Sequence, residues 1–143
     1  MQPWVYQEKE YHLPEGADPK NIQGFVYLLT NKFNGKKYIG KKFFWSAKSK
    51  QVKGKKKKFK IESDWKTYCG SSESVHKDIA KDGDDAFFRQ ILHVCRSKAE
   101  CSYWESFEIF SRLALLKPEE FYNEWVSCKI RRAHLKSLID VSC

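Results

Sequence analysis

No two of the 5 cysteines in this chain of 143 residues have the Cys-x-x-Cys spacing. Structural zinc sites use such spacings and disulfide frameworks use even numbers of cysteines, so neither kind of site is predicted. The sequence also has no apolar run of transmembrane length, and its beginning, MQPWVYQEKE, lacks the apolar segment of a secretory signal. These absences favour reduced thiols and a cytoplasmic location.

Acidic residues are absent from one long stretch. Between Lys36 and Lys60 there are 12 lysines in 25 residues and no Asp or Glu, whereas the rest of the chain has 15 basic and 18 acidic residues. The net charge of +9 therefore originates in this block. Lysines that neutralise phosphates release counterions, so the block predicts nucleic-acid binding, with a merely solvated loop as the alternative. It lacks the apolar face of a membrane-lying helix, so no membrane partner is expected.

The composition predicts one folded core. Hydrophobic residues make up 41% of the chain and aromatic residues 15%, which suits a single domain of this length. Residues 1–23 are polar and hold three of the 4 prolines, so we expect an N-terminal arm whose Trp4 and Tyr6 dock on the domain. Residues 24–143 are expected to form that domain, with a lysine-rich insert at 46–60 that is interpreted as a loop.

Two β-prone runs, GFVYLLT and KYIG, flank the turn signal NKFNG and predict a hairpin. A two-residue turn would place Tyr27 opposite Lys42, and a wider turn would place it near Tyr38. The sequence leaves this register open. Either register brings both tyrosines and the Lys41-Lys42 pair into one neighbourhood.

Later segments alternate between helix and strand signals. Ser72 has the position of an N-cap for a short helix that ends at Gly83, and Ser97 that of an N-cap for a longer helix. The run AFFRQILHVC between them predicts a third strand. The core candidates in this strand are Phe88, Ile91, Leu92 and Val94. With a last amphipathic helix predicted over 128–139, the order favours an α+β sandwich with a three-stranded, mostly antiparallel sheet.

The stretch around the two tyrosines resembles the GIY-YIG nuclease family. Its first element is FVY, which ends at Tyr27, and its second is a literal YIG, which begins at Tyr38 eleven residues later. In the first element, Gly24 lies one residue too early. Further along, Glu105 has the place of the family's helix glutamate, and Asn123 that of the asparagine after this helix. The strings YIGKK and ESDWKTYCGSS and the lysine insert are similar to small phage-encoded members.

The resemblance implies a metal-dependent DNA endonuclease that works in the cytoplasm of a bacterial host cell. Glu105 would bind one Mg²⁺ or Mn²⁺, with Glu100 or Glu108 as alternatives on the same helix. Tyr27 and Tyr38 would activate and position the attacking water, and which of them is the base stays open. Neighbouring lysines are expected to favour the phenolate. Asn123 would orient the phosphate or a water, and a glycine at position 40 would let the DNA backbone approach.

One departure from the family concerns its arginine, which usually lies about ten residues after the second tyrosine. That offset gives Lys48 here, and no arginine occurs before Arg89. Because a guanidinium binds phosphate with a fork and lysine is a point charge, the substitution matters. The role would pass to Lys42, Lys48 or Lys66, and we favour Lys42 because it lies beside the second tyrosine.

Basic side chains outside the chemistry are expected to bind the DNA backbone. These are Lys41, Lys48, Lys53, Lys55, Lys56, Lys57, Lys58, Lys66, Arg131 and Arg132. The alternative function is a non-catalytic nucleic-acid-binding protein of the same fold. A second nuclease motif would begin at Asp64, but it lacks an upstream acid. The sequence leaves open the DNA target, the choice between nicking and double-strand cleavage, and the oligomeric state.

Overall fold

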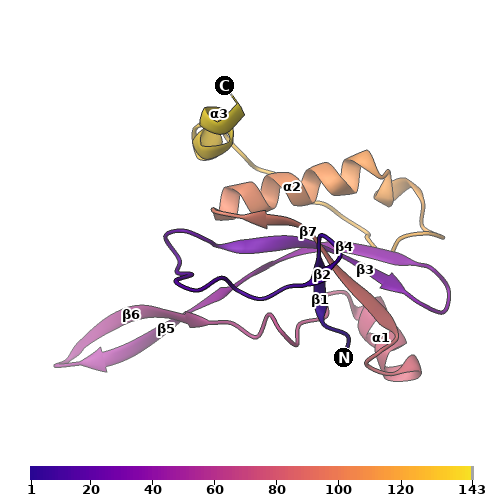
Figure 1. Cartoon of the computed structure of the whole chain (residues 1–143), viewed down its shortest axis with the longest axis horizontal. Coiled ribbons are helices and arrows are strands. Elements are labelled where there is room, and N and C mark those ends of the chain that lie inside the picture. Colours follow the sequence, from indigo (N-terminus) through magenta and orange to yellow (C-terminus); the bar gives the residue numbers. More distant parts are fainter. Residues whose placement is uncertain (143) are drawn as a thin grey trace.

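The computed structural model describes residues 1–142, with side chains up to Ile139. The strands are β1 (Trp4–Tyr6), β2 (Lys9–Glu10), β3 (Gly24–Asn31), β4 (Lys37–Phe43), β5 (Trp45–Val52), β6 (Lys55–Glu62) and β7 (Phe87–Cys95). The helices are α1 (Glu73–Asp82), α2 (Lys98–Ser111) and α3 (Lys136–Ser142), with short 3₁₀ helices at Ala114–Leu116 and Arg132–Leu135. This is an α+β fold, as predicted, and Figure 1 shows its arrangement.

The central sheet has five strands within the described range, in the order β2-β1-β7-β3-β4, so the prediction of three strands is wrong. The additional strands come from the N-terminal segment, where β1 pairs in parallel with β7 and antiparallel with β2. Trp4 in β1 is 2% exposed, and its indole nitrogen donates a hydrogen bond to the Trp65 carbonyl at 2.7 Å. A strand of three residues is too short to show a β period in sequence, and burial of its tryptophan holds it in place.

Strands β3 and β4 form the predicted antiparallel hairpin, with Tyr27 opposite Gly40. This register lies between the two that were considered. On its other side β3 pairs antiparallel with β7, and the register shifts between Val26 and Tyr27. Such β-bulges re-aim side chains and are frequent beside active sites. The bulge therefore adjoins the first tyrosine element.

The two faces of the sheet carry separate apolar cores. Phe25, Tyr27 and Leu29 of β3 pack on the side of α1, and Val26 and Leu28 pack on the side of α2. This alternation is the period of two expected for a strand that is covered on both faces. In Figure 1, α2 covers one side of the sheet and α1 lies on the other. Side chains from the helical layers on both faces of the sheet can therefore contact its outer strand β4.

The predicted helix starts and the third strand are confirmed. The Ser72 hydroxyl accepts a hydrogen bond from the Val75 amide at the start of α1, and the Ser97 hydroxyl accepts one from the Glu100 amide at the start of α2. Strand β7 coincides with the run predicted for it. Its core assignment is wrong at Phe88, which is 36% exposed, because the alternation buries its neighbour Phe87 instead.

Two later segments differ from the prediction. The lysine-rich segment is an antiparallel hairpin of β5 and β6 and not a loop. The last helix does not begin at residue 128, because the chain is irregular up to residue 131, where a 3₁₀ turn leads into α3. Among the described helices, none combines the length and the apolar character needed to cross a bilayer.

Candidate active site

A cavity of ≈ 360 Å³ lies at the edge of β4, the outer strand of the sheet. It is lined by Tyr27, Tyr38, Gly40, Lys41, Ser71, Ser102, Glu105, Trp125, Ser127 and Lys129. The lining comes from β3, β4, α2, the segment before α1 and the segment after the family-type asparagine. The cavity therefore unites both tyrosine elements with the helix glutamate.

Tyr27 is packed across the backbone of Gly40. The ring is 1% exposed, and a Cβ built on Gly40 would overlap its hydroxyl and its Cζ carbon. Only glycine leaves room for this ring, since moving a fully buried phenol would disturb the core. The sequence predicts that this glycine lets the DNA backbone approach. In the structure the space beside its Cα is filled by the ring of Tyr27.

The second tyrosine lies beside the first. The ring centroids of Tyr27 and Tyr38 are 6.3 Å apart, and the Tyr38 hydroxyl lies 3.4 Å from the Ser71 hydroxyl. Gly70, with φ +85°, brings the segment before α1 close to both rings. This left-handed backbone conformation suits glycine, because a side chain there is strained. Ser71 thus forms one wall of the cavity, and Gly70 precedes it in the chain.

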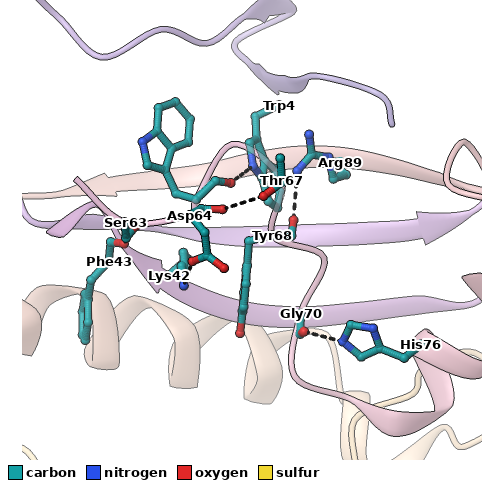
Figure 2. A network of polar contacts seen from close by, with 11 residues as sticks. Trp4, Lys42, Phe43, Ser63, Asp64, Thr67, Tyr68, Gly70, His76 and Arg89 are labelled. Atoms are coloured by element: carbon teal, nitrogen blue, oxygen red, sulfur yellow. Dashed lines mark hydrogen bonds and ion pairs between the residues drawn. The ribbon is translucent and has the colours of Figure 1, made fainter. Parts of the chain in front are cut away.

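A polar network fixes this wall in position, as Figure 2 shows. The guanidinium of Arg89 donates to the carbonyls of Tyr68 and Lys66 at 2.9 Å each, and to that of Gln2 at 2.7 Å. The His76 Nε2 lies 2.8 Å from the Gly70 carbonyl. Arg89 is 2% exposed, and so it organises backbone and is not available to a phosphate.

The carboxylate of Glu105 projects from α2 into the cavity beside Lys41. The Lys41 Nζ lies 3.7 Å from Glu105 Oε1 and donates a hydrogen bond to the Ser102 hydroxyl at 2.8 Å. Burial raises the pKa of Glu105, and the neighbouring lysine opposes this rise only in part. A half-buried carboxylate that costs energy to ionise is well suited to bind a cation.

The two alternative glutamates of α2 are engaged elsewhere. Glu100 accepts a hydrogen bond from the Arg96 amide at 2.9 Å and pairs with the side chain of Arg96, at the start of the helix. Glu108 lies 2.8 Å from both the His93 ring and the Arg112 guanidinium. These partners lower the pKa of Glu108 against the effect of its burial. Among the described residues, Glu105 is the only acidic residue of the cavity lining.

Lys42, favoured above as the substitute for the family's arginine, does not line this cavity. Its Nζ lies 2.7 Å from Asp64 Oδ1 and 4.1 Å from the centroid of the Tyr68 ring, and Figure 2 shows the lysine with both partners. Alternation along β4 explains the difference, because successive side chains point to opposite faces of the sheet. Asp64 is occupied in the same ion pair.

The other two candidate lysines lie away from the cavity. Lys48 is exposed on β5, and Lys66 is exposed with its Nζ 3.8 Å from Glu62. Most of the remaining basic residues expected to bind DNA are exposed as well: Lys53, Lys55, Lys56, Lys57, Lys58, Arg131 and Arg132. Arg131 and Arg132 lie at the 3₁₀ turn before α3. Their exposure leaves them free to contact a phosphate backbone.

Asn123 is 9% exposed, and both ends of its amide bind the backbone of β4. The Ile39 amide donates to Asn123 Oδ1 at 3.0 Å, and Asn123 Nδ2 donates to the Ile39 carbonyl at 2.8 Å. Hydrogen bonds between Lys37 and the backbone of residues 120 and 122 continue this pairing. The side chain therefore holds the segment that carries Trp125 against the edge of the sheet.

The acid–base state of the tyrosines differs from the expectation. Burial raises the pKa of Tyr27 well above its ordinary range, and Tyr68, Tyr38 and Glu105 add to this rise. Burial also raises the pKa of Tyr38, although the hydrogen bond with Ser71 opposes it. The expectation that lysines favour the phenolate is thus wrong for the protein without DNA. Both phenols are protonated at neutral pH.

Sequence reasoning missed several members of the lining, among them Trp125, Ser102 and Lys129. Trp125 is 72% exposed although it is a large aromatic residue. The available signal was its place two residues after Asn123, in the polar string NEWVSCK, which has no helical apolar period. A tryptophan in such a string has no core to join and is a candidate for contact with a partner.

The resemblance implies one divalent metal at this cavity. Among the described residues, no group of three or more His, Cys, Asp or Glu side chains is arranged around a common point. Mg²⁺ commonly uses one or two protein carboxylates and fills its shell with water and phosphate oxygens. A single carboxylate in a polar cavity fits this pattern, so Glu105 would hold Mg²⁺ or Mn²⁺ with oxygens of water or phosphate in the rest of the shell.

Comparison with known families gives an independent result. The family model described as "Putative endonuclease segE, GIY-YIG domain" matches residues 4–126. Comparisons with curated proteins and with solved structures gave no match. The matched range covers the sheet, both flanking helices and every member of the cavity up to Trp125. The chain therefore belongs to the segE group of the GIY-YIG endonuclease family.

Proposed function

We propose that this protein is a metal-dependent DNA endonuclease that hydrolyses phosphodiester bonds in the cavity at the edge of β4. The observation that carries the proposal is the convergence of Tyr27, Tyr38, Lys41 and Glu105 on one cavity. Phosphodiester hydrolysis needs an activated water and a cation near the developing charge of the phosphate. The residues of the cavity supply groups for both requirements.

Glu105 would hold the divalent metal, which supplies Lewis-acid stabilisation of the phosphate when bound. Lys41 would place a positive charge at the phosphate, because its ammonium group lies at the cavity and is kept there by Ser102 and Glu105. We assign the role of the missing arginine to Lys41 in place of Lys42. A lysine binds one phosphate oxygen at a time and lacks the fork of a guanidinium.

The two tyrosines would have different roles. Tyr27 is fully buried, with its pKa raised further than that of Tyr38, and serves as a fixed donor of a hydrogen bond to the phosphate or the water. Tyr38 is partly exposed, and its hydrogen bond with Ser71 lowers its pKa against the effect of burial. We therefore assign the proton acceptor to Tyr38. Since its pKa is raised, the active phenolate is scarce at neutral pH.

Asn123 would act as a positioning residue, because both atoms of its amide are used on Ile39. It would keep Trp125 and Ser127 at the rim of the cavity without touching the substrate. The basic surface of β5 and β6 would supply the affinity for the DNA backbone. This division separates the chemistry in the cavity from the binding charge on the hairpin.

Cleavage of supercoiled plasmid DNA tests the proposal. With Mg²⁺ or Mn²⁺ we expect conversion to the nicked form, since one metal site cuts one strand at a time, and we expect chelator to stop it. The rival function, a non-catalytic DNA-binding protein, is favoured by one observation: no arginine lines the cavity among the described residues. Binding in chelator without cleavage under any divalent metal would establish that rival.

A further inference from the structure

The hairpin of β5 and β6 projects from the sheet as an extended ribbon (Figure 1). All residues from Ala47 to Glu62 are exposed, and Glu62 at the base of the ribbon contacts Trp65 and Lys66 of the segment that follows. A two-residue turn closes it at Lys53 and Gly54, which both have positive φ values of 51° and 76°. Such turns match the twist of two paired strands and define a regular register.

The register assigns each lysine to one of two faces, because directly opposite residues of an antiparallel pair point to the same side. The first face carries the pairs Ala47↔Lys60, Ser49↔Lys58 and Gln51↔Lys56. The second face carries the pairs Lys48↔Phe59, Lys50↔Lys57 and Val52↔Lys55. Both faces of the ribbon therefore carry lysines along most of their length, and the second face also carries the exposed Val52, Phe59 and Ile61.

This two-sided charge is unusual for a ribbon that would lie flat on another surface. A hairpin that docks on a protein has an apolar face, whereas the exposed Val52, Phe59 and Ile61 of the second face are interspersed with four lysines. A hairpin that lies on a single phosphate backbone needs cations on one side only. On the second face Lys50 and Lys57 lie directly opposite each other, and like charges in this position destabilise the pairing. Negative charge against this face removes the repulsion, and the three lysines of the first face attract negative charge on the opposite side of the ribbon.

The major groove of duplex DNA is such a partner, because a phosphate backbone runs along each of its walls. It is about 12 Å wide and admits a two-stranded ribbon, whereas the minor groove of about 6 Å is too narrow. Strands of 8 residues extend over about 26 Å, which is several base pairs of duplex. The short Ser and Ala residues of the first face, Ala47 and Ser49, leave its lysines unobstructed.

We propose that the β5–β6 ribbon inserts into the major groove of duplex DNA, with its first and second faces contacting the phosphates of opposite walls. The inference rests on the proposed function, and it specifies duplex DNA as the substrate class. The ribbon would hold the duplex at a point away from the scissile phosphate, while the cavity at β4 engages the backbone itself.

The test uses two matched triple variants of exposed lysines. One is Lys56→Gln, Lys58→Gln and Lys60→Gln on the first face, and the other is Lys48→Gln, Lys50→Gln and Lys57→Gln on the second face. Affinity for a short DNA duplex is measured by fluorescence anisotropy in chelator at several salt concentrations. We expect both variants to weaken binding to a similar extent, and each to reduce the slope of log K against log salt by about 2–3 units.

Competition with groove ligands completes the experiment. Methyl green, which occupies the major groove, should displace the protein, whereas netropsin, which occupies the minor groove, should not. An RNA duplex should bind more weakly, because its major groove is too narrow for side chains. An effect of one face only, displacement by netropsin alone, or equal affinity for the RNA duplex would each overturn the inference. Because binding is measured in chelator, these outcomes are independent of whether the protein cleaves plasmid DNA.

Discussion

The ammonium nitrogen of Lys41 lies 3.7 Å from a carboxylate oxygen of Glu105, between the outer strand of the sheet and the helix that covers it. Ser102, one turn before Glu105 on α2, accepts a hydrogen bond from the same ammonium group. The three side chains form a small polar site in which a cation and an anion are already paired. In the proposed complex with DNA, Lys41 would pair with a phosphate and Glu105 with the divalent metal.

The first prediction concerns the carboxylate. Glu105→Gln should abolish plasmid cleavage while affinity for DNA changes by no more than a few-fold, because the substitution removes the metal ligand and no positive charge. Cleavage and anisotropy assays on the same preparation measure the two effects. Glu108→Gln is the control, since Glu108 pairs with His93 and Arg112 outside the cavity. An active Glu105→Gln variant with an inactive Glu108→Gln variant would mean that the metal binds at Glu108, one turn further along α2.

The second prediction separates two neighbouring lysines. Lys41→Ala should lower kcat by about 10²–10³ with a small change in KM, because its charge acts on the phosphate in the transition state. Lys42→Ala should change kcat little, since Lys42 does not line the cavity. It should also cost little stability, because its partner is the exposed Asp64 and such pairs contribute about 0–1 kcal/mol.

Lys48→Ala and Lys66→Ala are matched controls for this pair, because both side chains are exposed and outside the cavity. They should affect DNA affinity alone. If Lys42→Ala loses kcat while Lys41→Ala keeps it, Lys42 is the substitute for the family's arginine, as the sequence favoured.

The third prediction tests the roles of the tyrosines. Tyr38→Phe should lower the cleavage rate by about 10²–10⁴, as expected for loss of a general base. Because the pKa of Tyr38 is raised, the wild-type rate should increase by about tenfold per pH unit between neutral and mildly alkaline pH. Single-turnover rates at saturating protein measure both. A rate independent of pH, with an active Tyr38→Phe variant, would move the base elsewhere.

The fourth prediction concerns Asn123 as a positioning residue. Asn123→Ala should reduce the free energy of unfolding by about 1–3 kcal/mol, because it leaves the buried amide and carbonyl of Ile39 without partners. Urea unfolding monitored by circular dichroism gives this value. The kcat/KM of cleavage should also fall, and the fluorescence of Trp125 should change because its segment is no longer held. Unchanged stability with complete loss of cleavage would indicate direct contact with the substrate.

The fifth prediction follows from the raised pKa of Glu105. Metal binding requires the ionised carboxylate, so the affinity for Mn²⁺ should fall by about tenfold per pH unit as the pH drops below this pKa. The free energy of unfolding of the metal-free protein changes with pH in the opposite direction. A carboxyl whose folded pKa exceeds its unfolded pKa costs stability as the pH rises between the two values. Glu105→Gln should therefore remove both the metal binding and this loss of stability, as calorimetry would show.

Local signals in the sequence predict much of this fold. Serines 72 and 97 cap helices because their hydroxyls accept backbone hydrogen bonds, and this chemistry is readable without a structure. The convergence of Tyr27, Tyr38 and Glu105 followed from the order of motif elements. That Lys41 and not Lys42 lines the cavity could not be predicted, since it depends on which face of β4 meets α2.

Other features depend on distant contacts and have no local signal. Trp4 joins the sheet because it meets Trp65 and Arg89, far along the chain. The side-chain amide of Asn123 binds the backbone of Ile39, which lies 84 positions earlier in the sequence, and no sequence pattern near either residue reveals this contact. The lysine segment has few β-branched residues, and the repulsion between its lysines disfavours pairing. Its strands are therefore the least predictable of the sheet elements.

The parallel pairing of β1 with β7 has a consequence for the order of folding. Trp4 finds its place only after Arg89 and its neighbours, which come much later in the chain, have been synthesised. Contacts between such distant positions form slowly, because a long loop must close first. The hairpin of β3 and β4 has no such delay. Quenching of the Trp4 indole should therefore mark a late step of refolding, after the edge of the cavity has formed.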